Sequence, residues 1–246
     1  SSLLEYFLAK NMTNALLADN ENETLVAWDI PRPDRESLIF LGEMLDGLDD
    51  AKHRRVFNRF TNIAHSGSAR VRTTLLSYLL TAKSNEFPAI STRTLDLSHT
   101  DLRHWELGSK EDSLDLTGVP LIGAKIDDAI LTRVQFNHAN MIGASFVRTH
   151  LTKCSLTGAS LNNCDLSGAV FRHCDLTETS IGHTKRHRTQ FLFCHPTPEG
   201  DETLIAPNPA SDDLKTLMIY PGLGRIFCVK WSSDGTRILT TGYNGT

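Results

Sequence analysis

The sequence predicts a mixed, mainly β fold: a central solenoid, preceded by a helical bundle and followed by a β-hairpin. The main observation is a five-residue period of large apolar residues. Its members are Leu116, Leu121, Ile126, Leu131, Phe136, Met141, Phe146, Leu151, Leu156, Leu161, Leu166, Phe171, Leu176 and Ile181. Compact residues recur two positions before them. Neither a helix nor a strand has a period of five, so the repeat indicates a solenoid whose units bury their apolar side chains by stacking.

The repeating units carry a family resemblance. Residues 159–163 (Ala-Ser-Leu-Asn-Asn) and 164–168 (Cys-Asp-Leu-Ser-Gly) resemble pentapeptide repeats, whose usual form is A-(D/N)-L-x-x. The resemblance implies a right-handed, quadrilateral β-helix with one pentapeptide on each side and four in each coil. The large residue then fills the axis, the compact residue turns inward, and the other three positions face water.

The solenoid is expected over residues 94–186. Leu97, Leu102 and Leu107 extend the repeat upstream of its main run. The step from Leu107 to Leu116 is nine residues rather than ten. A bulge or small loop is therefore expected at residues 108–113.

Residues 1–84 are expected to form a helical bundle, because apolar residues recur there at helical spacing. Asp34 and Ser68 are expected to cap two of the helices. The apolar stripes are Leu4, Phe7, Leu8 and Met12; Leu38, Leu41, Leu45 and Leu48; Val56, Phe57, Phe60, Ile63 and Ala64; and Val71, Leu75, Leu76 and Leu79.

The first stripe carries a second resemblance. Residues 4–10 (Leu-Glu-Tyr-Phe-Leu-Ala-Lys) resemble the helix that closes the nucleotide-binding module of NACHT-type signalling NTPases of the STAND class. The resemblance implies that residues 1–84 are the C-terminal part of a NACHT-associated helical region. The sequence has no G-x-x-x-x-G-K-(S/T) phosphate loop, so a nucleotide-hydrolysing module is expected upstream of Ser1.

Downstream of the solenoid, residues 187–217 are expected to be a linker with a strand-like segment at 191–194. Asp234-Gly235 lies between two alternating apolar runs and predicts a hairpin. Residues 224–246 also resemble the opening of a WD-repeat blade, although Arg225, Ser233 and Asn244 depart from the usual His, Pro and Asp. The resemblance implies an incomplete propeller blade at 218–246.

The sequence predicts no catalytic residue, cofactor site or metal site. The G-x-S-x-G and H-E-x-x-H motifs are absent from it. The residues with metal-ligating character that cluster are His183, His187, Cys194 and His195. Their spacing is looser than the tight pairs of zinc sites and cations crowd them, which favours a solvated basic loop.

Three cysteines, Cys154, Cys164 and Cys174, fall at the compact inward position. They are expected to act as small apolar fillers. A disulfide between Cys154 and Cys174 is the alternative, but a reducing compartment disfavours it.

A short basic run offers a contact for phosphate or for an acidic partner: Lys185, Arg186 and Arg188. It lacks interleaved aromatic residues, so a solvated end of the solenoid is the favoured interpretation. Residues 114–188 carry six acids and eight bases, which argues against the acidic, DNA-like surface by which some pentapeptide proteins protect gyrase.

The predicted function is a non-catalytic scaffold and protein-interaction region. It would link an upstream NTPase switch to a downstream WD-repeat sensor in a bacterial-type signalling or defence protein. The net charge of −4 gives no overall bias toward nucleic acid, and the sequence shows neither a long apolar run nor a secretory signal. We therefore expect a cytoplasmic protein with protein partners and no membrane contact. The alternative is a free-standing pentapeptide-repeat protein that binds a topoisomerase or nucleic acid.

Overall fold

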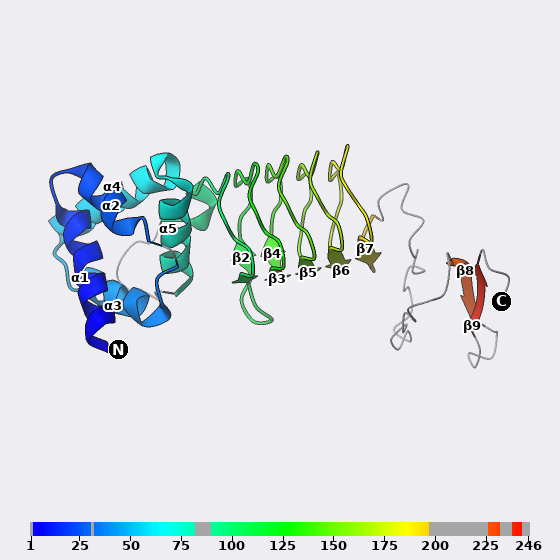
Figure 1. The fold of residues 1–246 in the computed structure, drawn as a ribbon, viewed down its shortest axis with the longest axis horizontal. Helices are drawn as coiled ribbons and strands as arrows, with labels where there is room; N and C mark the ends of the chain where they lie inside the picture. The colour runs from blue at the N-terminus through cyan, green and yellow to red at the C-terminus, as the bar shows by residue number, and fades with distance from the viewer. Residues whose placement is uncertain (1, 31, 82–89, 197–225, 232–237, 243–246) are drawn as a thin grey trace.

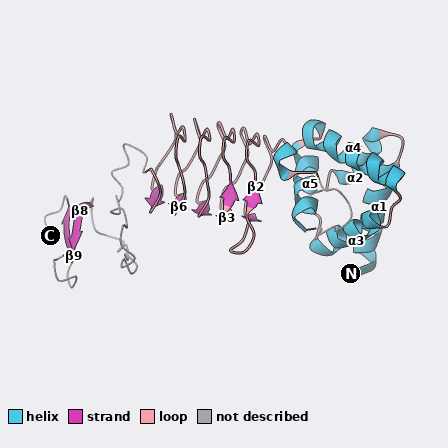
Figure 2. Cartoon of the chain, turned by 180° about the vertical axis from the view of Figure 1, so that it is seen from behind, coloured by secondary structure: helices cyan, strands magenta, loops and turns pink. Residues whose placement is uncertain are grey.

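The computed structural model describes residues 2–30, 32–81, 90–196, 226–231 and 238–242. A helical bundle lies at one end, and a solenoid extends from it as a rod (Figures 1 and 2). The helices of the bundle are α1 (Ser2–Leu17), α2 (Glu21–Trp28), α3 (Arg35–Asp46), α4 (Asp50–Ser66) and α5 (Ala69–Thr81). In the described part of the chain, no helix is both long and apolar enough to cross a membrane.

The helix starts follow the expected capping chemistry. The Asp34 carboxylate accepts a hydrogen bond from the Ser37 backbone N–H at 2.8 Å and begins α3. The Ser68 hydroxyl accepts one from the Val71 N–H at 3.3 Å, at the start of α5. A side-chain acceptor at these positions satisfies an N–H that has no partner within the helix.

The predictions of two apolar stripes are wrong for some of their residues. On α1, Leu4 and Phe7 are 76% and 55% exposed, while Met12 is fully buried. The buried face of α1 continues from Met12 to Leu16 instead, because this side of the helix packs against α3. On α4, Phe57 is 39% exposed and lies beside the buried stripe rather than in it.

The helix α2 was not expected, because residues 18–25 read as a polar stretch. It begins at an Asn20 cap, whose side chain accepts from the Asn22 N–H at 3.0 Å. It ends in Trp28, which is fully buried and whose indole N–H donates to the Met12 carbonyl at 3.3 Å. Tertiary packing around this one aromatic residue therefore outweighs the polar local sequence.

Aromatic rings form the centre of the bundle. The ring of Phe60 lies 5.3 Å from those of both Trp28 and Tyr78, and all three side chains are buried. They come from α4, α2 and α5, so one cluster joins three helices. Burial and the charge of Asp46 raise the pKa of Tyr78, which keeps its hydroxyl protonated at neutral pH.

The solenoid is a stack of parallel strands that recur once in every four pentapeptides. Ile130 pairs with His150, His150 with Val170, and Val170 with Gln190. The five-stranded sheet has the order β1-β3-β5-β6-β7, and β2 pairs with β4 on a second side. These strands are β1 (Glu106–Leu107), β2 (Leu114–Asp115), β3 (Ile130–Thr132), β4 (Val134–Gln135), β5 (His150–Thr152), β6 (Val170–Arg172) and β7 (Gln190–Leu192). The register of these pairs confirms four pentapeptides in each coil.

The structure places the large residues of the five-residue repeat on the axis. Of the fourteen from Leu116 to Ile181, all are buried except Ile181, which is partly buried against the same core. Axis N–H groups also donate to carbonyls of the next coil, as Leu116 does to Gln135 and Phe136 does to Ser155, at 2.8 and 2.7 Å.

The stack continues past the expected boundary at residue 186. β7 adds a further strand to the ladder, and Phe191 is 3% exposed on the axis, stacked on Phe171 at 4.8 Å. His195 still pairs with Asp175. Residues 187–196, expected to open a linker, are therefore a part of the solenoid; residues 197–217 lie outside the described residues.

The corners of the solenoid from Gly118 to Phe193 have a residue in the left-handed region, two positions after each axis residue. Gly118 has φ +72°, and the Leu116 carbonyl accepts from the Val119 N–H across it at 3.2 Å, which is the geometry of a type II turn. Glycine is favoured there, but non-glycine residues such as Lys153, with φ +55°, adopt the same conformation. The stacking of coils therefore overrides the local preference of these residues.

A loop at residues 108–113 interrupts the repeat, as expected, but its length differs from the expectation. Leu107 pairs with Leu131 and Leu131 with Leu151, so the coil that contains the loop is longer than the one after it. Leu114 lies in β2, on the side of the coil that directly follows the side of Leu107. The chain from Leu107 to Leu116 is therefore one pentapeptide with an inserted loop, and not two pentapeptides with one residue missing.

A serine holds this loop together. The Ser109 hydroxyl accepts hydrogen bonds from the backbone N–H groups of Glu111 and Asp112, at 3.2 and 2.9 Å. The Ser109 N–H in turn donates to the Asp112 carbonyl at 2.9 Å. The inserted residues therefore form a compact turn of their own and leave the strands on either side in register.

The two strands of the expected hairpin are present, while its expected turn at Asp234-Gly235 lies outside the described residues. β8 (Ile226–Trp231) and β9 (Ile238–Gly242) pair antiparallel, with an irregularity between Ile226 and Cys228. These bounds lie within one residue of the strands expected near 227–231 and 238–241. Their hydrogen-bonded pairing shows a two-stranded hairpin and does not show a propeller blade.

Gly108 and Gly118 provide a test of the loop. Both have φ near +70°, but a Cβ on Gly108 would lie 2.0 Å from the Thr132 carbonyl oxygen, whereas a Cβ on Gly118 would meet nothing within 4 Å. Gly118→Ala should cost about 1 kcal/mol through the left-handed backbone alone. Gly108→Ala should cost clearly more in urea unfolding, since backbone must move. An equal loss of unfolding free energy in the two variants would contradict the close approach of the loop to the next coil.

Candidate interaction surfaces of the solenoid and bundle

The compact inward position carries polar groups as well as alanine. The hydroxyls of Thr149 and Thr189 each donate to a carbonyl 23 residues earlier, at 2.7 Å, and both side chains are buried. Thiols use the same geometry, as Cys164 does toward the Met141 carbonyl at 2.9 Å. Each such bond joins one coil to the one before it, so these residues stabilise the rod rather than forming a site.

The cysteines at this position are free thiols. Burial raises the pKa of Cys164 to about 11, and the neighbouring Cys154 thiol together with burial raises that of Cys174 to about 12. A thiol with so high a pKa is protonated at neutral pH and is a poor nucleophile. The geometry supports their role as fillers.

The four residues considered as metal ligands lie on different sides of the coil. His183 stands at the corner after one axis residue and His187 on the next side, while Cys194 turns inward and His195 extends the ladder from Asp175. Within the described residues, no group of three or more His, Cys, Asp or Glu side chains is arranged to hold a metal ion. The four-sided coil separates residues that are close in sequence.

The three cations of the predicted basic run lie on one side of a single coil, but they differ in direction and in partners. Lys185 forms an ion pair with Asp165 of the coil before it, at 3.6 Å. Arg186 occupies an axis position above Leu166, and one of its guanidinium nitrogens is fully buried. Arg188 stands exposed at a corner. Lys185 is paired and Arg186 turns inward, which leaves Arg188 as the exposed cation of the run without an ion pair among the described residues.

Opposite charges of successive coils pair on one side of the solenoid, which we call the paired edge. It contains Asp128 and Arg148, joined by two hydrogen bonds of 2.7 and 2.6 Å, and the pair Asp165 and Lys185. The Arg148 guanidinium lowers the pKa of Asp128. Successive coils neutralise one another along this edge.

A second edge carries cations without acidic partners. Arg133 and Lys153 occupy the corner after β3 and β5, and Arg172 is the last residue of β6. We call these three residues the basic ridge. All three are exposed, and no acidic side chain among the described residues forms an ion pair with any of them. Arg133 donates one hydrogen bond, to the Lys110 carbonyl of the loop, at 3.1 Å.

Sequence reasoning missed the ridge. Its three cations recur at intervals of about one coil, and this spacing was visible in the repeat. A basic run along the chain, such as residues 185–188, is the usual sequence signal for such a site, and cations that lie one coil apart do not give that signal. In a solenoid, cations one coil apart lie closer to a common surface than cations that follow one another around a corner.

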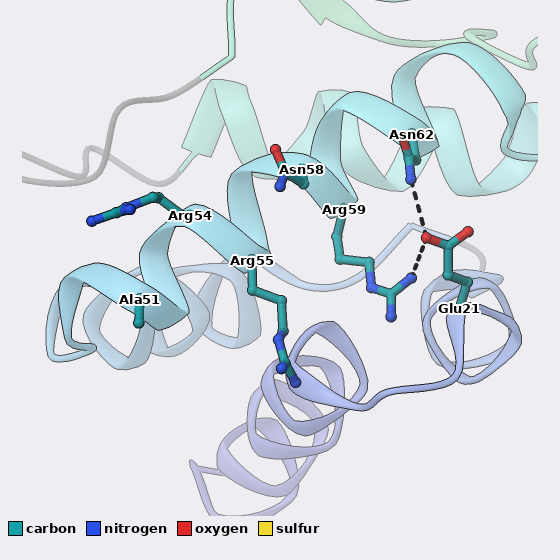
Figure 3. Close-up of a pocket in the computed structure, with 7 residues that line it drawn as sticks. All are labelled: Glu21, Ala51, Arg54, Arg55, Asn58, Arg59 and Asn62. Carbon is teal, nitrogen blue, oxygen red and sulfur yellow. Dashed lines mark hydrogen bonds and ion pairs between the residues drawn. The ribbon is translucent and has the colours of Figure 1, made fainter.

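The helical bundle has a pocket of about 460 Å³ beside α4. Arg54, Arg55 and Arg59 extend from α4 along its wall, and Glu21 enters from the start of α2 (Figure 3). Three arginines in one pocket suggest a site for an anion, so their partners decide whether the pocket is available.

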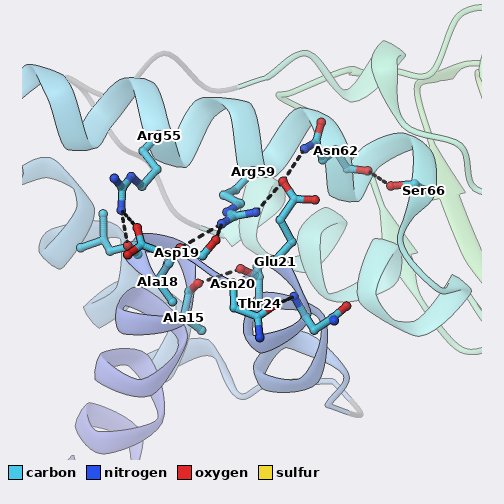
Figure 4. A network of polar contacts seen from close by, with 12 residues as sticks. Ala15, Ala18, Asp19, Asn20, Glu21, Thr24, Arg55, Arg59, Asn62 and Ser66 are labelled. Carbon is cyan, nitrogen blue, oxygen red and sulfur yellow. Dashed lines mark hydrogen bonds and ion pairs between the residues drawn. The ribbon is translucent and has the colours of Figure 1, made fainter.

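Two of the three arginines are engaged within the protein (Figure 4). Arg55 donates to the Leu17 carbonyl at 2.7 Å and pairs with Asp19 at 3.1 Å. Arg59 is 8% exposed, donates to the Ala18 and Asp19 carbonyls, and pairs with Glu21 at 2.5 Å.

The function of this network is local. It satisfies carbonyl groups at the C-terminal end of α1, where positive charge is also favourable to the helix dipole. The network therefore joins α1 and α2 to α4, and Arg54 is the remaining exposed cation of the pocket.

The comparison with protein families identifies the solenoid. Residues 115–152 and 154–185 match the pentapeptide repeats, in eight copies. The solenoid therefore carries pentapeptide repeats. Its five-residue period, inward axis and four-pentapeptide ladder are the features that the sequence shares with this family.

Solved structures of three pentapeptide-repeat proteins are similar to the solenoid. Rfr23 from the cyanobacterium Cyanothece is 18% identical, over 44% of this chain and 67% of that one, with a TM-score of 0.32. HetL from Nostoc, which is involved in heterocyst differentiation regulation, is 24% identical over 39% and 46%, with a TM-score of 0.26. A thylakoid-lumen protein from Arabidopsis thaliana is 28% identical over 36% and 62%, also at 0.26. No curated protein matches the chain.

The pocket can be tested with two arginines of the same helix. Arg59→Met should lower the free energy of unfolding by about 1–3 kcal/mol, because it leaves the Ala18 and Asp19 carbonyls without this donor and the Glu21 carboxylate without its cation. Arg54→Met, at an exposed position, should change it by less than about 0.5 kcal/mol. Thermal and urea unfolding measure both. Similar, small effects would show that Arg59 does not join the helices.

Proposed function

We propose that this chain is a non-catalytic scaffold in which the solenoid holds the helical bundle and the segment after it at a fixed separation. The observation that supports this proposal is the joint between α4, α5 and the first coil. There the bundle and the solenoid share one continuous apolar core, and charged hydrogen bonds cross between them. Two parts joined in this way move together, whereas a flexible linker would let each part move independently.

Arg72 of α5 is the main polar contact of the joint. It is 8% exposed, pairs with Asp96 at 2.9 Å and donates to the Ser98 carbonyl at 2.8 Å. The Asp96 N–H in turn donates to the Ala64 carbonyl at the end of α4, at 3.0 Å. The first coil of the solenoid is therefore hydrogen-bonded to both helices that face it.

The charge of Asp96 is part of the joint. Burial works to raise the pKa of its carboxyl, but hydrogen bonds from Ser98 and the charge of Arg72 outweigh burial, so the pKa lies below the usual 3.8. A lowered pKa in the folded state stabilises the protein above the unfolded value. This contribution to the free energy of unfolding is present at neutral pH. It is lost as the pH falls below the pKa of the carboxyl group in the unfolded chain and then through its lower pKa in the folded protein.

A second contact lies at the rim of the joint. The Arg32 guanidinium stands 5.0 Å from the ring centre of Trp105 and donates to the Arg103 carbonyl at 3.2 Å. A cation over an indole face is favourable by about 0.5–1 kcal/mol at an exposed site. Arg32 precedes α3, so this contact connects a further part of the bundle to the solenoid.

The wider assignment is also a proposal. In it, the bundle follows a nucleotide-binding switch of the NACHT type, and the C-terminal hairpin opens a WD-repeat sensor. The resemblance of residues 4–10 and of residues 224–246 supports these parts, and the β8–β9 pairing is compatible with the second. A stiff solenoid between them would transmit the position of the sensor to the switch.

Spin labels measure the stiffness of the joint. Labels introduced through non-natural amino acids at His65 and Asn163, both exposed, report the separation of α4 from the middle of the solenoid. The wild-type chain should give one narrow distance distribution. Arg72→Met should broaden it, because the buried contacts to Asp96 and Ser98 are lost.

The matched control is Arg70→Met on the same helix. Arg70 has a side-chain exposure of 61% and pairs with Asp29 within the bundle, so its loss should leave the distribution narrow. A broad distribution in the wild-type chain would contradict the scaffold role.

A further inference from the structure

The basic ridge borders the outer face of the five-stranded sheet, which runs along one side of the rod (Figure 1). The strand register places one residue of each coil in a column on this face. Ile130 in this column is 49% exposed, and Val170 is partly exposed, with His150 between them. The cations of the ridge lie along the border of this face. A partner that rests on the sheet would therefore meet both apolar and cationic groups.

The ridge is not neutralised along its length. The nearby acidic residues lie toward its two ends: Glu106 and Glu111 before Arg133, and Asp175 after Arg172. The paired edge shows that this chain does place acids and bases on successive coils. The stacked cations of the ridge are a departure from that pattern, and they leave positive charge free for a partner.

We propose that this face binds an acidic amphipathic helix of a partner protein, with carboxylates along the basic ridge and apolar side chains on Ile130 and Val170. The inference rests on the proposed scaffold role and names the surface by which the scaffold recruits a partner. Charge complementarity along the ridge supplies orientation and association rate. Burial of Ile130 and Val170, which alternate with His150 and Gln190 in the column, adds apolar contact.

The spacing of the ridge favours a helix. Successive coils are about 4.8 Å apart, as neighbouring strands are. Residues three and four apart on a helix have Cβ atoms about 5–6 Å apart, which matches this interval. Alternate residues of an extended strand are about 6.6 Å apart and match it less well. A helix lying parallel to the rod can thus present one carboxylate to each coil.

A protein partner fits better than nucleic acid. The ridge has three cations and lies beside the apolar side chains of Ile130 and Val170, and the rings at its end are stacked on each other. His173, the ring beside Arg172, is already stacked on Phe193 at 5.0 Å.

Fluorescence anisotropy tests the inference with a labelled synthetic helical peptide that carries glutamates on one stripe and leucines on the next. The wild-type chain should bind it, and the affinity should fall as salt is added. The ridge variant is Arg133→Gln, Lys153→Gln and Arg172→Gln in one chain. It should bind at least about tenfold more weakly, because each lost cation leaves a carboxylate without a partner.

The matched control removes the same charge from elsewhere on the rod. It is Lys125→Gln, Arg148→Gln and Lys185→Gln, and its affinity should stay within about twofold of the wild type. Circular dichroism confirms that both variants remain folded. A peptide with the same composition but scrambled stripes should bind weakly.

Three results would overturn the inference: no binding of the helical peptide, equal loss in both variants, or tighter ridge-dependent binding of a single-stranded oligonucleotide. The last would assign the ridge to nucleic acid. The scaffold role is judged separately, because the spin-label distances can be measured on the ridge variant. A narrow distribution without peptide binding would leave the scaffold role intact and remove the docking surface.

Discussion

The backbone hydrogen bonds between coils are the interaction on which the rest of the structure depends. The N–H of Phe136 donates to the carbonyl of Ser155 in the next coil, and the N–H of Ser155 donates back to the carbonyl of Val134. A coil by itself has no such partners, and its apolar side chains have no neighbours to cover them. The bundle provides the first layer, through Ala64, Arg72 and the shared core.

This ladder also determines the surface. A coil of four pentapeptides places residues of equal register directly above one another, so a residue type that recurs once in each coil becomes a column. Asp128 and Arg148 form an ion pair in this way, and Arg133 and Lys153 bring like charges together. Two chemically different edges thus arise from the same backbone geometry.

The solenoid could be predicted from the sequence because its period is unusual and its register is strict. The axis positions, the inward compact residues and a loop after Leu107 all follow from the repeat. The end of the stack could not be found in the same way: Arg186 stands where a large apolar residue is expected, and Phe191 resumes the pattern one unit later. This one polar residue at an axis position made the repeat look as if it ended at residue 186.

The interaction surfaces were harder to predict, because they depend on which residues share a side of the coil. The helix α2 was also missed, because the burial of Trp28 that explains it is not visible in the local sequence.

Native-state hydrogen exchange tests most directly whether the bundle and the solenoid form one rod. The amide groups to compare are those of Gly67, which ends α4, and of Phe136 and Leu156 in successive coils; all three donate within the structure. With increasing denaturant, we expect their opening free energies to converge on a single value, because the ladder and the shared core open together. If the Gly67 amide lost its protection while Phe136 and Leu156 kept theirs, the bundle would be an independent unit and the central claim would be wrong.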